Sequence, residues 1–297
     1  MTPKHPQNLK SPKQIKHLSA LGKFAASSIF VLVLLMIITP FFTPYTPDAI
    51  DLNNKFAPIS KEHWLGSDHL GRDIFTRIVY GAHISLGAVG LILLMVVSLG
   101  ITIGGISGAL GGVWDRIIMR LCDIFLSLPT IVLSLFFIGI LGSGLSNIIL
   151  AITLTHWAWY ARIVRSIVLQ RKHKEFVLLS SMYGASFLQN FRRNMLPPIA
   201  TQCLVLATMD IGHMMLHIAG LSFLGLGVQP PQAEWGIMLS EVKDFLWSAP
   251  HLLLYPGLAL FISVALFNLL GDSLRDYFDV ETTTSAPKTF TTKAYNV

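Results

Sequence analysis

The sequence predicts an all-α membrane protein with six transmembrane helices, on three observations. The 297-residue chain is 53% hydrophobic and only 13% charged, whereas soluble domains carry about 25% charged residues. It contains six apolar runs close to the roughly 20 residues that a helix needs to cross the hydrocarbon layer. Its lysines and arginines gather in alternate segments between those runs. We therefore interpret the net charge of +6 as a signal of membrane topology and not of nucleic-acid binding.

The apolar runs give the positions of the expected helices. The first follows several lysines, so a signal peptide is an alternative to a membrane anchor. Its length and its Thr-Pro-rich end, which lacks a small-x-small cleavage site, favour an uncleaved anchor. The six runs are Phe24–Phe42, Ile84–Ile106, Ile124–Leu141, Leu145–Ala161, Ile199–Leu221 and Leu252–Leu270.

Basic residues predict the orientation of these helices. With the N-terminus inside, 17 of the 22 lysines and arginines lie in cytoplasmic segments, as the positive-inside rule requires. Both termini are then cytoplasmic. The expected parts are a cytoplasmic tail (1–23), the first transmembrane helix (24–42), an extracytoplasmic segment (43–82), a transmembrane core (83–272) containing a docking loop (171–198), and a flexible C-terminal tail (280–297).

The loop between the fourth and fifth runs is patterned. It reads EFVLLSSMYGASFLQNFRRNMLPP from Glu175 to Pro198. Its glycine, Gly184, permits a sharp turn after a short helix, and its Leu-Pro pair is expected to begin the next membrane helix. We expect this basic, amphipathic segment to present a face to another protein.

The fifth run is unusual because it carries polar residues on one helical face. Asp210, His213, Met214 and His217 follow the spacing i, i+3, i+4 and i+7. A carboxylate in mid-membrane is costly and normally faces a cavity or a partner. Imidazole and thioether groups can contact a passing transition metal, and His156 in the fourth run is a further candidate. Two interpretations stay open: a cargo path, or polar contacts that specify helix packing.

Enzymatic functions find little support in the sequence. The HMMLH segment has the HxxxH spacing of membrane desaturases, but it is a single box in mid-membrane. The chain contains neither HExxH nor the GxxxxGK[ST] phosphate loop. We expect no catalytic residue, no stable metal site and no bound cofactor. A metalloenzyme of the desaturase kind and a secondary transporter remain as alternatives from other classes.

Three separated motifs resemble ABC importer permeases of the dipeptide, oligopeptide and nickel group. They are HWLGSDHLGRDIFTR (63–77), GASFLQNFRRNMLPP (184–198) and LSFLGLGVQPPQAEWG (221–236). The resemblance implies a type I ABC importer transmembrane domain in a bacterial plasma or inner membrane. It also implies a second homologous permease, two ATP-binding cassette subunits that hydrolyse ATP, and an extracellular or periplasmic solute-binding protein. The implied ATPase-coupling residues are Glu175, Gly184, Ala185, Arg192, Leu196 and Pro197.

The departures from the family pattern bear on the cargo. Leu178-Leu179-Ser180 stands where the general docking loop has Glu-Ala-Ala, and Asn194 replaces the usual isoleucine. Ile218 stands where peptide permeases are expected to have a glutamate. DIGHMMLH, THWAWYAR and AEWG resemble the nickel-transport members instead. The resemblance thus implies a nickel or other transition-metal cargo, carried as a chelate, with a di- or oligopeptide as the alternative. The expected cargo-path residues are His156, Asp210, His213, Met214 and His217.

Overall fold

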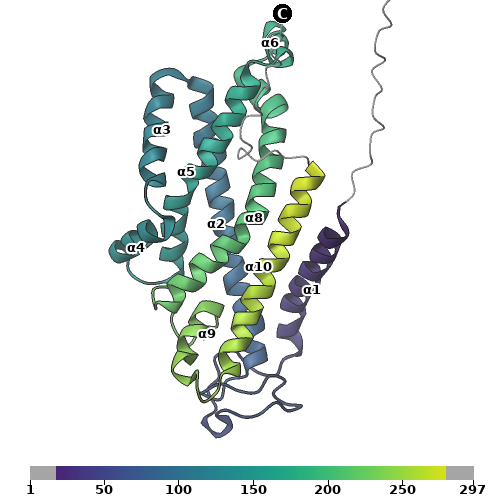
Figure 1. Cartoon of the computed structure of the whole chain (residues 1–297), viewed down its shortest axis with the longest axis vertical. Helices are drawn as coiled ribbons and strands as arrows, with labels where there is room; N and C mark the ends of the chain where they lie inside the picture. Colours follow the sequence, from purple (N-terminus) through teal and green to yellow (C-terminus); the bar gives the residue numbers. More distant parts are fainter. Residues whose placement is uncertain (1–17, 279–297) are drawn as a thin grey trace, which may run out of the picture.

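The computed structural model describes residues 18–278, which form a helical bundle (Figure 1). The predicted C-terminal tail and residues 1–17 of the predicted N-terminal tail lie outside this range. The helices are α1 (Ala20–Phe42), α2 (Ile74–Leu110), α3 (Gly112–Leu126), α4 (Thr130–Leu141), α5 (Leu145–Lys172), α6 (Glu175–Met182), α7 (Phe187–Asn190), α8 (Leu196–Phe223), α9 (Trp235–Val242) and α10 (His251–Phe278), with two 3₁₀ turns (Leu52–Asn54 and Lys243–Phe245) and a π-helical turn (Phe191–Met195) before α8.

The expectation of six membrane spans is confirmed in part. Within the described residues, four helices are long and apolar enough to span a membrane: α1, α2, α10 and the helix that continues from α7 through α8. The α3–α4 pair makes a fifth if it counts as one bent span. The 28-residue α5 is long enough but too polar to qualify by composition. It lies inside the bundle, packed along α2, where polar side chains cost less than they would against lipid.

One boundary differs from the prediction. The run Ile124–Leu141 is not one helix, because α3 and α4 meet at a 90° bend. Pro129 caps the start of α4, and a proline disfavours helical backbone in the residue before it.

Helix α2 begins at Ile74, inside the segment 43–82 that is predicted to be extracytoplasmic, and runs without a break for 37 residues. Asp73 sets that start by accepting a hydrogen bond from the backbone N–H of Thr76 (2.8 Å).

Glycines on α2 let α5 approach closely. A Cβ atom at Gly100 would lie 2.4 Å from Cβ of Tyr160, and one at Gly104 would lie 2.2 Å from the carbonyl oxygen of Ala161. No real Cβ contact is that short, so only glycine fits at either position. The same two helices contribute Ile92, Val96, Ile148 and Ile152 to the main apolar core. This tight pairing holds the polar residues of α5 at a defined depth and orientation.

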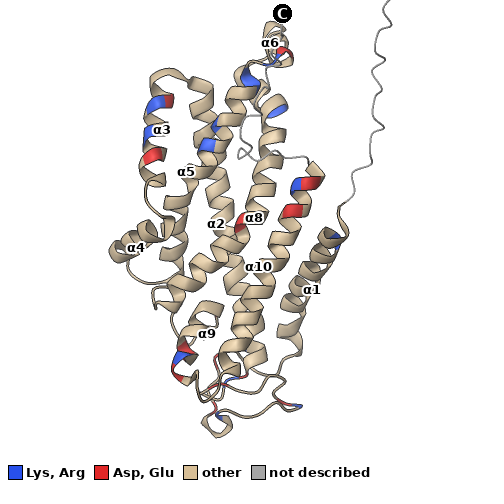
Figure 2. Ribbon diagram, viewed as in Figure 1, with Lys and Arg blue, Asp and Glu red and all other residues tan. Residues whose placement is uncertain are grey.

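The two ends of the bundle differ in content. The start of α1, the end of α10 and the α6 region lie at one end, and α9 with the segment between α1 and α2 lies at the other (Figure 1). Charged side chains gather toward these ends, and the middle of the bundle carries few (Figure 2). We call the end with α6 the loop end and the end with α9 the outer end.

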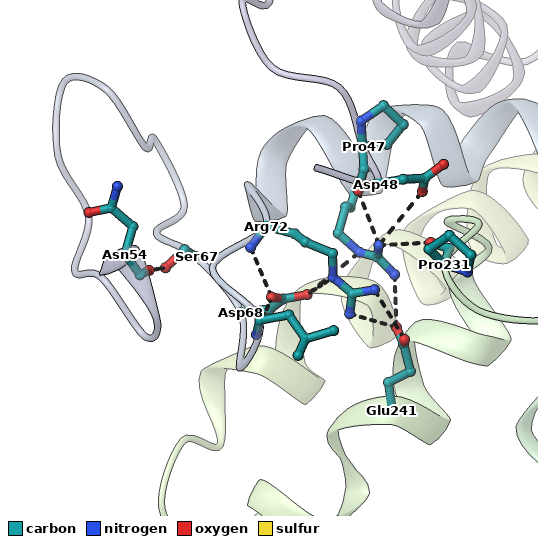
Figure 3. Close-up of polar contacts among 10 residues, drawn as sticks. Pro47, Asp48, Asn54, Ser67, Asp68, Arg72, Pro231 and Glu241 are labelled. Carbon is teal, nitrogen blue, oxygen red and sulfur yellow. Dashed lines mark hydrogen bonds and ion pairs between the residues drawn. The ribbon is translucent and has the colours of Figure 1, made fainter. Parts of the chain in front are cut away.

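A buried ionic cluster joins the pieces of the outer end (Figure 3). This outer cluster consists of Asp68, Arg72, Arg77 and Glu241, all nearly buried. Arg72 donates to Asp68 (2.6 Å) and, through both terminal nitrogens, to Glu241 (3.1 and 3.0 Å). Arg77 donates to Glu241 (2.8 Å) and to the carbonyl oxygen of Pro231 (3.1 Å). Two guanidinium groups and two carboxylates thus tie α9 to the start of α2.

The other end of α9 is also fastened to α2. Glu234 is 1% exposed and caps the helix by accepting hydrogen bonds from the backbone N–H groups of Gly236 and Ile237. It also accepts one from the Ser85 hydroxyl (3.0 Å). The indole of Trp235 donates to the carbonyl oxygen of Ile78 (3.0 Å). Helix α9 is therefore bound to α2 at both of its ends.

Candidate functional site

Asp210 is the centre of a polar group in the middle of the bundle. Its Oδ2 atom lies 2.8 Å from Nε2 of His156 and accepts a hydrogen bond from the Tyr160 hydroxyl (3.2 Å). Both partners come from α5, whereas Asp210 comes from α8. The side chain of Asp210 is only 10% exposed. The structure therefore joins α5 and α8, which carry the three candidate histidines, at one carboxylate, as expected for a costly charge that needs partners.

The other oxygen of this carboxylate faces a histidine from its own helix. Oδ1 of Asp210 lies 3.7 Å from Nδ1 of His213, too far for a hydrogen bond. His213 is the exposed member of the group, with 74% of its side chain accessible. One turn further along, His217 buries its Nδ1 atom with no hydrogen-bond partner among the described residues. We call His156, Tyr160, Asp210, His213 and His217 the Asp210 cluster.

Met214 does not join this cluster. Its place on a cargo path stays a prediction, but its side chain is 0% exposed and belongs to the main apolar core. The physical reason is the helical repeat of about 100° per residue. The side chains three and four residues after Asp210 therefore project to opposite sides of the Asp210 side chain. The later of the two, Met214, faces the apolar core.

Tyr160 is a functional candidate that sequence reasoning did not include. Its side chain is fully buried, and its hydroxyl shares the carboxylate oxygen that His156 also contacts. Its spacing one turn after His156 was visible in the sequence, but only the tertiary contact with Gly100 and Asp210 identifies its role.

The cluster is not a preformed metal centre. Among residues 18–278, no group of three or more His, Cys, Asp or Glu side chains is placed to hold a metal ion. The donors of the Asp210 cluster come from both α5 and α8, and those of α8 are spread along the helix axis. Such an arrangement suits transient contact with a cargo.

The docking loop projects from the loop end as two short helices. Glu175 is the first residue of α6, where its carboxylate complements the helix dipole. Gly184 has φ +89°, a left-handed conformation that favours glycine, and so confirms the predicted turn. The loop exposes large apolar side chains, an arrangement typical of a surface that binds another protein. These are Phe176, Leu178, Leu179, Met182, Tyr183, Phe187 and Leu188.

Three predicted coupling residues lie together in this loop. Gly184, Ala185 and Arg192 line a hollow of about 570 Å³, while Glu175 is not among its lining residues. Leu196 is the first residue of α8 and Pro197 follows it, which confirms the predicted start of the helix. Because proline has no backbone N–H, Pro197 makes no hydrogen bond back into the π-helical turn from which α8 continues.

Asparagines that the sequence reading did not explain hold the loop together. The Asn194 amide donates to the side-chain oxygen of Asn190 (2.7 Å), and the Asn190 amide donates to the Ser181 hydroxyl (2.9 Å). Asn190 is buried, and Asn194 belongs to the π-helical turn Phe191–Met195. This chain of hydrogen bonds connects α6 to the beginning of α8, the helix that carries Asp210.

Comparisons with known proteins agree with this architecture. Residues 100–283 match the family described as "Binding-protein-dependent transport system inner membrane component". The nickel transport system permease protein NikC of Escherichia coli (strain K12) is 49% identical over 257 residues, covering 86% of this chain and 93% of NikC. The glutathione transport system permease protein GsiD of Escherichia coli O157:H7 is 40% identical over 256 residues, covering 86% of this chain and 84% of GsiD.

A solved structure shares the fold. It is the MetNI methionine ABC transporter in an inward-facing conformation, with a TM-score of 0.56 and 21% sequence identity over 69% of this chain and 97% of the matched chain. At that identity the likeness concerns the arrangement of the helices alone. The family match, which spans more than half of the chain, and the high identity to NikC identify the protein. The chain belongs to the family of binding-protein-dependent transport system inner membrane components and is a multi-pass permease subunit of an ABC importer.

Proposed function

We propose that this permease subunit forms half of the translocation path for nickel or another transition metal, carried as a chelate. The observation that carries the proposal is the exposed imidazole of His213 beside the buried carboxylate of Asp210, in the middle of an otherwise apolar helix. A group this polar at mid-membrane depth needs a water-filled path or a partner protein beside it. The 49% identity to NikC, named as a nickel transport permease, supports the same cargo.

The proposed assembly contains a second, homologous permease that faces the exposed side of α8. Two ATP-binding cassette subunits bind the α6–α7 loop, and a solute-binding protein delivers cargo to the outer end. The excess of lysine and arginine at the loop end supports a cytoplasmic position for that end and for both termini. The chain itself performs no catalysis and binds no cofactor in this proposal.

The mechanism is alternating access driven by the ATPase subunits. ATP binding closes these subunits and moves the bound α6–α7 loop. The asparagine contacts and the π-helical turn transmit this motion to α8, because they join the loop to the first turn of that helix. Movement of α8 relative to α5 then changes access to the Asp210 cluster. Glu175, Gly184 and Arg192 act in the docking of the loop.

Radiolabelled nickel uptake tests the cargo. Cells that lack this gene are complemented with wild-type protein or with the double variant His213→Ala/His217→Ala at matched membrane abundance. We expect uptake with the wild type and at least a tenfold lower rate with the variant, because mutation even of groups that only orient metal ligands typically costs about 10–100-fold in metal affinity or activity. Inactivation of the partner ATPase should abolish uptake, and uptake that continues without it would instead indicate a secondary transporter.

A di- or oligopeptide is the second candidate cargo. The 40% identity to GsiD, named as a glutathione transport permease, is the observation that favours it. Labelled glutathione and labelled dipeptides are supplied to the same strains. Peptide uptake that depends on the gene, together with nickel uptake that does not, would retain the importer assignment and replace the cargo.

A further inference from the structure

We propose that the cargo passes α8 as a divalent cation with at least two exchangeable coordination positions, bound directly and in turn by His213 and His217. A cargo enclosed in a complete, anionic chelate would not be bound. This inference rests on the proposed function and specifies the chemical form in which the metal crosses the middle of the bundle.

The first argument is that the two oxygen atoms of the Asp210 carboxylate have different partners. Its Oδ2 atom already contacts Nε2 of His156 and the Tyr160 hydroxyl. Its Oδ1 atom faces His213 across 3.7 Å, a gap too long for a hydrogen bond. One carboxylate oxygen therefore holds the side chain in place, and the other is left to interact with a charge beside the exposed imidazole.

The second argument is the spacing of the two imidazoles. His213 and His217 are four residues apart on a continuous helix, the separation at which two helical histidines can ligate one metal ion. The buried Nδ1 atom of His217 has no hydrogen-bond partner among the described residues. A desolvated nitrogen without a partner is unfavourable, and rotation toward a bound cation would compensate it. His217 also lies within electrostatic range of His156, Asp210 and His213.

The third argument is the charge of the surrounding helices. Asp210 is the one charged residue of α8, α2 has none after Arg77, α5 has none before Arg162, and α10 has none before Asp272. The middle of the bundle is accordingly almost free of charged side chains (Figure 2). With one carboxylate and no cationic partner, this region attracts a cation and repels an anionic complex.

Metal binding to the purified importer tests the inference. The complex is isolated through a histidine-free tag on this chain, and ⁶³Ni²⁺ binding is measured by equilibrium dialysis. We expect reversible binding of weak affinity, reduced at least tenfold by His213→Ala or His217→Ala. The control His251→Ala removes an exposed histidine at the start of α10 and should leave binding unchanged.

The form of the metal is tested on the same sample. Nickel supplied with one equivalent of free histidine retains open coordination positions and should bind. Nickel in the hexadentate, anionic EDTA chelate should not. Equal binding of the EDTA complex, or binding that both histidine variants retain, overturns the inference.

A ligand exchange separates direct binding from a structural role. The variant His213→Cys keeps a metal-binding atom at this position. When Co²⁺ is the probe, the spectrum of the variant should contain a thiolate-to-metal charge-transfer band that the wild type lacks. Absence of that band in a correctly assembled complex overturns direct ligation by this position. Nickel uptake that depends on the gene, without binding that depends on His213, overturns the inference and leaves the proposed function standing. Absence of nickel uptake that depends on the gene overturns both.

Discussion

Two buried groups of charged residues, the outer cluster and the Asp210 cluster, differ in how completely their charges are compensated. The outer cluster pairs two guanidinium groups with two carboxylates, and each arginine contacts both acids. The Asp210 cluster has a single carboxylate beside imidazoles and a phenol, and one imidazole is largely exposed. Complete pairing is typical of a fixed structural joint, whereas a carboxylate with a free side is suited to binding something that comes and goes.

The difference extends to the elements that each group connects. The outer cluster joins the segment between α1 and α2 to α9, and the cap of α9 fastens its other end to α2. The Asp210 cluster connects α5 and α8 by one shared oxygen atom. A single hydrogen-bonded oxygen can be released when α8 moves, and the bidentate contacts at the outer end resist such a separation. We infer that motion during transport occurs between α5 and α8 and not between α2 and α9.

The substitution with the largest expected effect breaks the outer cluster. Glu241→Ala removes one of the two carboxylates that the buried Arg72 and Arg77 guanidinium groups share, and leaves only Asp68. Loss of one partner from a buried ion pair costs about 3–5 kcal/mol, so the thermal unfolding temperature and the membrane abundance should both fall. The matched control is Glu62→Ala, which removes an exposed glutamate from the segment between α1 and α2 at the same outer end. Equal stability of the two variants would contradict a structural role for the cluster.

An intermediate loss of stability and uptake is expected from a substitution at the helix contact that positions the Asp210 cluster. Gly100→Ala places a Cβ atom 2.4 Å from that of Tyr160, and overpacking of this kind costs about 1–3 kcal/mol. It should also displace the Tyr160 hydroxyl from Asp210 and reduce uptake per copy of protein. Gly87→Ala serves as the control on the same helix, because nothing lies within 4 Å of its Cβ position. The destabilisation is measured by thermal unfolding, and the loss of transport is measured as the initial uptake rate per copy of protein.

The smallest effect is expected from Tyr160→Phe. This change removes one of two groups on the Oδ2 atom of Asp210 and leaves the His156 contact in place. Loss of one such hydrogen bond costs about 0.5–1.5 kcal/mol, far less than the Glu241 change. Thermal unfolding of the two variants side by side provides the comparison. A destabilisation by Tyr160→Phe as large as that of Glu241→Ala would mean that both clusters are structural joints.

Features that depend on short stretches of chain were predicted well. The apolar runs located the membrane helices because burial in lipid is determined by local composition and length. Gly184 indicated the turn and Pro197 the start of α8, since each residue restricts the backbone at its own position. The spacing of Asp210 and His213 on one helical face was visible for the same reason.

Features that depend on distant residues were missed. The bond between Arg77 and Glu241 spans 164 residues, and no periodicity in either segment indicates such a pairing. Met214 and His213 are equally compatible with the face defined by Asp210, so only packing decides which of them is buried. The 90° bend between α3 and α4 was not predicted from the run Ile124–Leu141, because its size depends on how both helices pack against α5.

The sequence by itself thus determined the membrane class, the approximate helix positions, the docking loop and the polar stripe of α8, because hydrophobicity, helical period and backbone restriction act over a few residues. Only the tertiary structure decided which charges are paired and which are left open. The glycines of α2 bring α5 close, α5 supplies two partners to one oxygen of Asp210, and the other oxygen remains facing His213. Whether a buried charge is neutralised depends on atoms that meet only after the helices have packed.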